Sequence, residues 1–242
     1  SRNIPAVDLL LRLEENSFYQ MLEKAGVKKL KTPGYYGLAL ALGGAEVSAQ
    51  DLAALYAMLG NGGKFRPLRW RKDEPQLPET AMLSPEAAFL TLDMLSYNAP
   101  VDRRRLPFAK RSGTPYKVYW KTGTSYGYKD AWAAGLFGDF VLVVWVGNFD
   151  GTPNPAFTGR EAAAPLFFRL VRQIAAGRGI AGDSIRPDGL NLSQADICAA
   201  TGDLADAYCP QTVKSYFIPG VTRIKLSGVS RRIPIEVASG LR

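Results

Sequence analysis

The sequence predicts an α+β fold, because helical and β-strand patterns occupy different parts of its 242 residues. The N-terminal part carries apolar residues at helical spacing, divided by glycine and proline into several segments. Runs rich in β-branched and aromatic residues follow at 118–121, 131–137 and 140–146, and a last helical pattern covers 161–176. An antiparallel sheet flanked by helices explains this order.

Start signals mark the first helices. Pro5 suits the first turn of one helix, and Ser17 with Gln20 predicts a capping box for a second helix that stops at Gly26. A turn-rich segment, 32–44, is expected to follow.

Two more helices are expected before the sheet. Ser48 with Asp51 predicts the cap of a helix that ends in the glycine-rich stretch 60–63. Ser84, followed by proline and glutamate, predicts the start of another helix that runs to about Tyr97.

The β-rich runs include a hairpin, since Gly138 and Asp139 form a tight connection between the second and third runs. Both of these runs are nearly continuous in apolar residues. Such strands are buried on both faces, so we expect helices on each side of the sheet. The helical pattern at 161–176 supplies one of them.

The composition changes after Gly177. Residues 182–189 are rich in glycine, proline and aspartate, which is typical of a linker. We therefore expect one domain over 1–181, and a linker with the start of a small β-rich module over 182–242. Short strands of that module are expected at 215–218, 221–226 and 233–237.

Two cysteines, Cys198 and Cys209, lie in the C-terminal part. In an oxidising compartment a disulfide between them would contribute ~3 kcal/mol by closing the intervening loop. The alternative is two unrelated buried thiols. No metal is expected, because two sulfur ligands without any histidine do not make up a metal site.

The charge and the missing histidine limit the possible functions. A net charge of +8 could attract an anionic partner or could belong to a solvated basic face. No nucleic-acid recognition motif accompanies the charge, so nucleic acid is not expected as a partner. Without histidine, a Ser-His-Asp triad is excluded, and hydrolase or transferase chemistry must use lysine, carboxylate or hydroxyl groups.

The stretch 121–125, Lys-Thr-Gly-Thr-Ser, carries the clearest chemical signal. An ammonium beside hydroxyls suits a substrate carboxylate, and a glycine lets a substrate approach the backbone. In a strand, Lys121 and Gly123 face one side while Thr122 and Thr124 face the other. A lone Lys-Thr-Gly triplet also occurs in ordinary turns, so the motif needs further support.

The first residues of the chain supply that support. Ser1 offers a hydroxyl that can relay a proton, and Asn3 offers an amide that can hold a peptide carbonyl. Either residue could instead cap the helix that starts beside it. Ser-x-Asn followed by Lys-Thr-Gly matches two members of the motif set of β-lactamases and penicillin-binding proteins, whose other member is Ser-x-x-Lys.

Together with Ala-Leu-Gly-Gly-Ala-Glu-Val-Ser at 41–48 and Leu-Gly-Asn-Gly-Gly at 59–63, these motifs resemble the transpeptidase domain of class A penicillin-binding proteins. The run 126–133 and the two cysteine segments are most similar to the 1C type. The resemblance implies the penicillin-binding protein/β-lactamase-like transpeptidase fold for 1–181 and the family's small C-terminal β module beyond it. It implies no metal and no organic cofactor.

By motif position, the resemblance implies that Ser1 relays a proton, that Lys121 positions Ser1, and that Asn3 holds the acyl-side backbone of the substrate. The Thr124 N–H would form half of an oxyanion hole, and the two threonines would bind the terminal carboxylate of a D-Ala-D-Ala stem peptide or of a β-lactam. The implied substrate-binding stretch is Thr122, Gly123, Thr124 and Ser125.

One member of the motif set is missing, because no serine in the sequence has lysine three residues later. Thr114 and Lys117 have the spacing of the missing motif, but threonine stands in place of serine and a proline lies between the two residues. We therefore expect the nucleophile on a preceding polypeptide, and we expect this chain alone to be inactive. The resemblance also implies a glycosyltransferase domain further upstream. The resemblance implies the periplasmic side of a bacterial inner membrane, with the anchor outside this chain.

These observations predict a serine-type D,D-transpeptidase that cross-links peptidoglycan stem peptides and is inhibited by β-lactams. A carboxypeptidase or a β-lactamase would use the same motifs with water as the acceptor. The alternative from another class is a non-catalytic module that binds wall peptides or β-lactams.

Overall fold

The computed structural model describes residues 2–15, 17–96, 116–183, 185 and 187–229. The chain forms two compact units, Ser1–Arg186 and Pro187–Arg242, so the division lies slightly beyond the expected boundary at 181/182. The functions assigned to the two parts from the sequence remain predictions.

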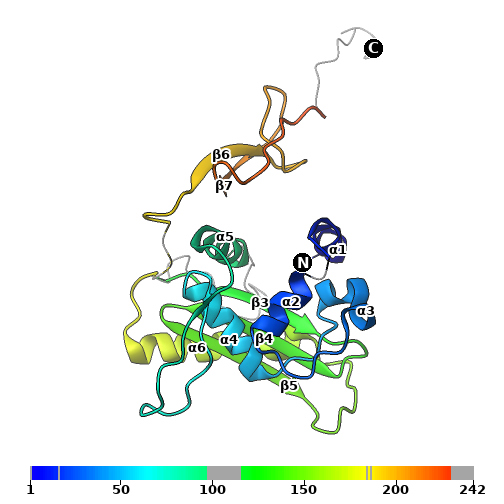
Figure 1. Cartoon of the computed structure of the whole chain (residues 1–242), viewed down its shortest axis with the longest axis vertical. Coiled ribbons are helices and arrows are strands. Elements are labelled where there is room, and N and C mark those ends of the chain that lie inside the picture. The colour runs from blue at the N-terminus through cyan, green and yellow to red at the C-terminus, as the bar shows by residue number, and fades with distance from the viewer. Residues whose placement is uncertain (1, 16, 97–115, 184, 186, 230–242) are drawn as a thin grey trace. The chain divides into compact units, whose positions relative to one another are not determined.

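The first unit is built on a three-stranded antiparallel sheet with the strand order β3-β4-β5 (Figure 1). These strands are Tyr119–Thr124, Asp130–Phe137 and Phe140–Gly147. The predicted hairpin between the last two is confirmed, with Phe137 opposite Phe140 and with Gly138 at a φ of 50° that favours glycine.

One face of this sheet is covered by α6, Ala164–Arg178, which follows the π-helical segment η3, Gly159–Ala163 (Figure 1). Phe167 of α6 is fully buried and stacks on Trp120 of β3 at a ring distance of 6.2 Å. The predicted helix at 161–176 is thus confirmed, with a widened first turn that the sequence did not indicate.

The opposite face is covered by α4, Ala49–Gly60, and α5, Pro85–Ser96 (Figure 1). Leu92 of α5 packs in one cluster with Tyr119 of β3 and Leu136 of β4. Helices therefore lie on both faces, as the apolar strands predicted.

The expected start signals of α4 and α5 are present. The Ser48 hydroxyl accepts a hydrogen bond from the Asp51 amide at 3.1 Å, and the Asp51 carboxylate accepts one from the Ser48 amide at 3.0 Å. The Ser84 hydroxyl accepts from the Ala87 amide at 3.1 Å. These bonds satisfy backbone donors that a helix leaves unpaired at its N-terminus.

The N-terminal segment is more helical than predicted. The expected helices are present as α1, Asn3–Arg12, and α2, Ser17–Lys24, although Ser17 is the first helical residue and not the cap. The segment expected to consist of turns instead forms α3, Pro33–Tyr36, and the 3₁₀ helix η1, Gly37–Leu42. Tertiary packing explains the difference, because Tyr36 and Leu40 are buried in a cluster with Leu22 and Val27.

Two short strands hold together the two ends of the segment between α4 and α5. They are β1, Lys64–Phe65, and β2, Thr80–Ala81, which pair antiparallel. The Gly63 carbonyl also accepts hydrogen bonds from the amides of Met82 and Leu83. The ends of the 66–79 segment are therefore held together while its middle lies at the surface.

The second unit contains the antiparallel pair β6, Ser193–Cys198, and β7, Thr212–Phe217. A disulfide joins Cys198 to Cys209 across the connection between them. The strand expected at 221–226 is wrong, since this segment makes only an isolated bridge between Leu204 and Leu226. The expected strand at 233–237 lies outside the described residues.

Candidate active site

The motif strand β3 is the edge strand of the described sheet, because only β4 pairs with it. Ser125 pairs with Asp130 through a backbone hydrogen bond from the Ser125 amide to the Asp130 carbonyl at 3.0 Å. In an antiparallel ladder, hydrogen-bonded and non-bonded pairs alternate along the strand. The pair Thr124 and Ala131 is therefore a non-bonded one, and the N–H of Thr124 points away from β4 towards the open edge.

The side chains of β3 divide between the two faces of the sheet. Trp120 packs under α6, so Thr122 and Thr124 share the α6 face. Tyr119 packs beside α5, so Lys121 and Gly123 share that opposite face. Both sets border the outer edge of β3, with which no strand pairs in the described chain.

Lys121 is half-buried, and the loss of solvent around it lowers the pKa of its ammonium. Its Nζ donates a hydrogen bond of 2.6 Å to the carbonyl of Thr122, which lies on the open edge. No carboxylate forms an ion pair with Lys121 among the residues that the structure describes. A desolvated lysine of this kind is suited to proton transfer and to attraction of an anionic substrate group.

Thr124 is held by a residue far along the chain. Its Oγ1 accepts a hydrogen bond of 2.9 Å from the amide of Gly159, the first residue of η3. A Cβ on Gly159 would lie 2.3 Å from the Gly123 carbonyl oxygen and 2.9 Å from the Thr122 Cβ. Only glycine allows η3 to lie this close to the motif strand, and nothing in the sequence spacing indicated this contact.

Ser125 closes the turn after the motif. Its Oγ accepts a hydrogen bond of 2.8 Å from the Asp130 amide, and the Asp130 carboxylate accepts one of 2.8 Å from the indole N–H of Trp145. The Ser125 hydroxyl therefore has a structural partner already. A contact between Ser125 and a substrate stays a prediction.

A second long-range contact fixes the other end of β3. The buried Tyr119 hydroxyl donates a hydrogen bond of 2.6 Å to the carboxylate of Asp183. The pKa of Tyr119 is raised, mainly by burial of the hydroxyl and to a smaller extent by this hydrogen bond. The chain after α6 is thereby attached to the strand that carries Lys121.

The N-terminal candidate residues are placed in part. Ser1 lies outside the described residues. Asn3 is the first residue of α1, and Arg2, whose side chain makes no capping hydrogen bond, is the N-cap, so the alternative of Asn3 as a cap is wrong. In the described part of the chain no side-chain hydrogen bond joins Asn3 to Lys121, and their meeting in one site stays a prediction.

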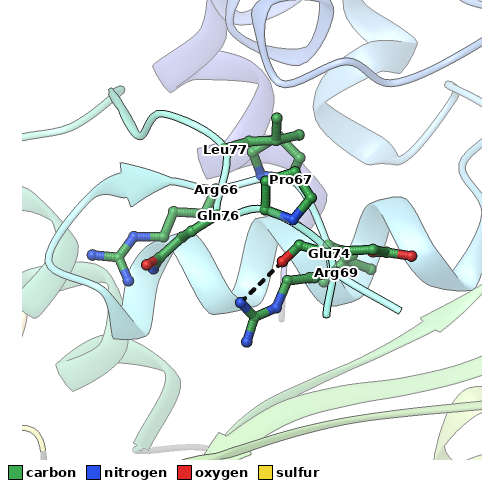
Figure 2. A pocket seen from close by; sticks show the side chains of 8 residues that line it. Arg66, Pro67, Arg69, Glu74, Gln76 and Leu77 are labelled. Atoms are coloured by element: carbon green, nitrogen blue, oxygen red, sulfur yellow. Dashed lines mark hydrogen bonds between the residues drawn. The ribbon is translucent and has the colours of Figure 1, made fainter. Parts of the chain in front are cut away.

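A cleft elsewhere in the first unit contains none of the candidate residues. It lies in the segment between β1 and β2, where the Arg69 guanidinium donates to the Glu74 carbonyl at 3.4 Å (Figure 2). Its lining residues are Arg66, Pro67, Leu68, Arg69, Glu74, Pro75, Gln76 and Leu77. None of these residues belongs to the motif strand β3.

Two further features are absent from the described ranges. No three histidine, cysteine, aspartate or glutamate side chains gather there into a group that could hold a metal ion. No helix of that part combines the length and the apolar character needed to cross a membrane.

Comparison with protein families gives two matches. Residues 1–171 match the penicillin binding protein transpeptidase domain. Residues 187–222 match the C-terminal domain of penicillin-binding protein 1A. The second match begins at the first residue of the second compact unit.

Individual relatives agree with these matches. The chain is 30% identical over 224 residues to penicillin-binding protein 1C of Escherichia coli (strain K12), covering 91% of this chain and 28% of that protein. It is 28% identical over 185 residues to penicillin-binding protein 1A of Clostridium tetani, covering 70% of this chain and 23% of that protein. The chain thus spans less than a third of the length of these relatives.

A solved structure has the same fold. The crystal structure of penicillin-binding protein 1A from Haemophilus influenzae superposes with a TM-score of 0.71 at 21% identity. The match covers 93% of this chain and 40% of that chain.

Proposed function

The chain belongs to the penicillin-binding protein transpeptidase family, and from that membership we propose that it forms part of a serine-type D,D-transpeptidase. The reaction cross-links peptidoglycan stem peptides, and β-lactams inhibit it by acylating the same serine. One observation carries this proposal: the outer edge of β3 presents a desolvated lysine beside the backbone N–H of Thr124, which has no hydrogen-bond partner among the residues that the structure describes.

In the proposed reaction a serine hydroxyl attacks the carbonyl between the two D-alanines of a stem peptide. The serine proton passes to the leaving amine, D-alanine departs, and an ester to the serine remains. The amine of a neighbouring stem peptide then attacks this ester, loses a proton and restores the serine hydroxyl. Water in place of the amine would give carboxypeptidase activity instead.

Residues of β3 and of the N-terminal segment would each contribute a different group to this reaction. The Lys121 ammonium would position the proton-relaying hydroxyl of Ser1, and the Asn3 amide would hold the acyl-side backbone. The N–H of Thr124 would donate to the oxyanion, a contact worth about 3–4 kcal/mol in the transition state. The hydroxyls of Thr122 and Thr124 would bind the terminal carboxylate, with Gly123 allowing its close approach.

The attacking serine is proposed to come from a preceding segment of polypeptide. The absence of any Ser-x-x-Lys sequence among the 242 residues supports this assignment. Of the alternative pair, Thr114 lies outside the described residues, and Lys117 lies 4.0 Å from the Asp183 carboxylate. We further propose an upstream glycosyltransferase domain and a position on the periplasmic side of the inner membrane.

The proposal can be tested by adding a fluorescent penicillin to a longer polypeptide, in which this chain is joined to the segment that precedes it. We expect covalent labelling that survives boiling in detergent, that ampicillin competes away, and that mass spectrometry maps to a serine before Ser1. Absence of labelling in a folded sample would favour the second candidate, a non-catalytic module that binds wall peptides. That module would bind a D-Ala-D-Ala peptide reversibly without forming an ester.

A further inference from the structure

Three aromatic side chains are exposed on two loops at the Thr124 end of the sheet. Tyr126 and Tyr128, in the turn between β3 and β4, are 99% and 49% exposed, and Phe149, after β5, is 101% exposed. We call these three residues the aromatic rim. Large rings that stay in water on ordered loops are typical of binding surfaces, because leaving them exposed is otherwise unfavourable.

The two loops of the rim are fixed to each other. The Asn154 amide donates a hydrogen bond of 3.0 Å to the Tyr128 carbonyl, and Tyr128 adopts a φ of 58°, which is uncommon for a residue with a side chain. The side-chain amide of Asn148 donates to the Thr152 carbonyl at 2.9 Å and closes the second loop. The rim is therefore a preorganised surface.

The rim is continuous with the candidate active site. Tyr126 is two residues after Thr124, so their Cα atoms are at most about 7 Å apart. A row of rings also leads from the motif strand to Phe149. Trp132 lies opposite Gly123, Trp145 lies 6.3 Å from Trp132, and Phe149 lies 5.5 Å from Trp145, ring to ring.

We propose that the aromatic rim binds the saccharide attached to the stem peptide, so that it selects glycan-linked substrate over free peptide. An apolar peptide side chain gains most in an enclosed pocket that removes it from water. An open ring face instead suits a pyranose, which stacks its C–H face on the ring and keeps its hydroxyls in water. This inference rests on the proposed function, because the rim adjoins the strand that would hold the peptide.

The test compares two acyl donors with the polypeptide that carries this chain and the segment before it. One donor is a stem pentapeptide ending in D-Ala-D-Ala, and the other is the same peptide on its disaccharide. We expect the double variant Tyr126→Ala/Phe149→Ala to lower the ratio of kcat/KM for the glycan-linked donor to that for the free peptide about three- to tenfold. Trp70→Ala, which removes a largely exposed ring outside the rim, is the control and should leave the ratio unchanged.

The outcomes separate this inference from the proposed function. If the unmutated protein reacts with fluorescent penicillin but the ratio stays the same in the double variant, the saccharide assignment is wrong. An equal loss for both donors would also overturn it and would make the rim a peptide contact. If the unmutated protein shows neither labelling nor turnover, the proposed function itself fails.

Discussion

The amide of Gly159 donates a hydrogen bond to the hydroxyl oxygen of Thr124, 35 residues earlier in the chain, at 2.9 Å. The bond uses the acceptor capacity of the hydroxyl and leaves its O–H free to donate to a substrate carboxylate. It also fixes the Thr124 side chain on the α6 face while the Thr124 N–H points to the open edge. The helix that covers the sheet thus determines how the motif strand presents its polar groups.

Replacing Gly159 by alanine should destabilise the first unit by about 1–3 kcal/mol, because the added Cβ would overlap the Gly123 carbonyl oxygen and the Trp132 carbonyl oxygen. Urea unfolding followed by circular dichroism measures the change. Gly177→Ala is the matched control, since nothing lies within 4 Å of a Cβ there. Because alanine favours a helix over glycine, the control should gain up to about 1 kcal/mol. Equal effects of the two substitutions would contradict the close approach at position 159.

Replacing Thr124 by valine should reduce the rate of acylation by a D-Ala-D-Ala peptide about 10- to 100-fold, since a hydrogen bond to a charged carboxylate is lost. The backbone N–H at this position remains, so some reaction should persist. Thr124→Ser keeps the hydroxyl and should retain most of the rate. Stopped-flow measurement with the polypeptide that carries the nucleophile gives the rates. A serine variant as slow as the valine variant would show that the hydroxyl is not the operative group.

Replacing Lys121 by methionine should slow acylation about a hundredfold or more, because the group proposed to direct proton transfer is removed. The same substitution tests the lowered pKa of Lys121 through the free energy of unfolding. Burial disfavours the charged form in the folded state, so this cost is fully present below the folded pKa. The cost of burying the charge falls as the pH rises from the folded pKa to the ordinary pKa of 10.5, and it is absent above that value.

The unmutated chain should therefore gain stability relative to Lys121→Met between neutral pH and about pH 10.5. Denaturant titrations at a series of pH values measure the difference. Lys129→Met, at an exposed position in the β3–β4 turn, controls for general effects of losing a lysine. A flat difference for Lys121→Met would mean that the ammonium is not desolvated.

Removing the disulfide by Cys198→Ser/Cys209→Ser should destabilise the second unit by about 3 kcal/mol, because the cross-link limits the unfolded chain. Hydrogen exchange should rise at the Cys198 and Ala199 amides, which bond to the Asp203 and Gln211 carbonyls. Exchange in β3, β4 and β5 should stay unchanged, since these strands belong to the other unit. Faster exchange throughout the chain would contradict independent units.

The local parts of this fold were predictable because they depend on neighbours in the sequence. The helix caps at Ser48 and Ser84 and the Gly138 hairpin follow from backbone donors and φ preferences within four residues. The segment 33–42 was not predictable in this way. Its proline and glycines favour turns, but burial of Tyr36 and Leu40 against α2 makes it helical.

The candidate site likewise combines local features that the sequence predicts with long-range contacts that it does not. The alternation of faces along 121–124 follows from strand geometry alone. The contacts from Gly159 to Thr124 and from Tyr119 to Asp183 join residues separated by 35 and 64 positions, and no local pattern indicates them. Strand β6 was missed because Ser-Gln-Ala-Asp has low β propensity, and pairing with β7 overrides it.

The pairing of β1 with β2, together with the hydrogen bonds to the Gly63 carbonyl, makes the segment between these strands suitable for labelling. Because the ladder holds both ends of the intervening segment, extra residues added at its tip should cost little closure entropy. A fluorophore or short epitope inserted near Lys72, which is exposed, would report on the molecule without touching the motif strand. This surface segment is thus a natural attachment point for a label.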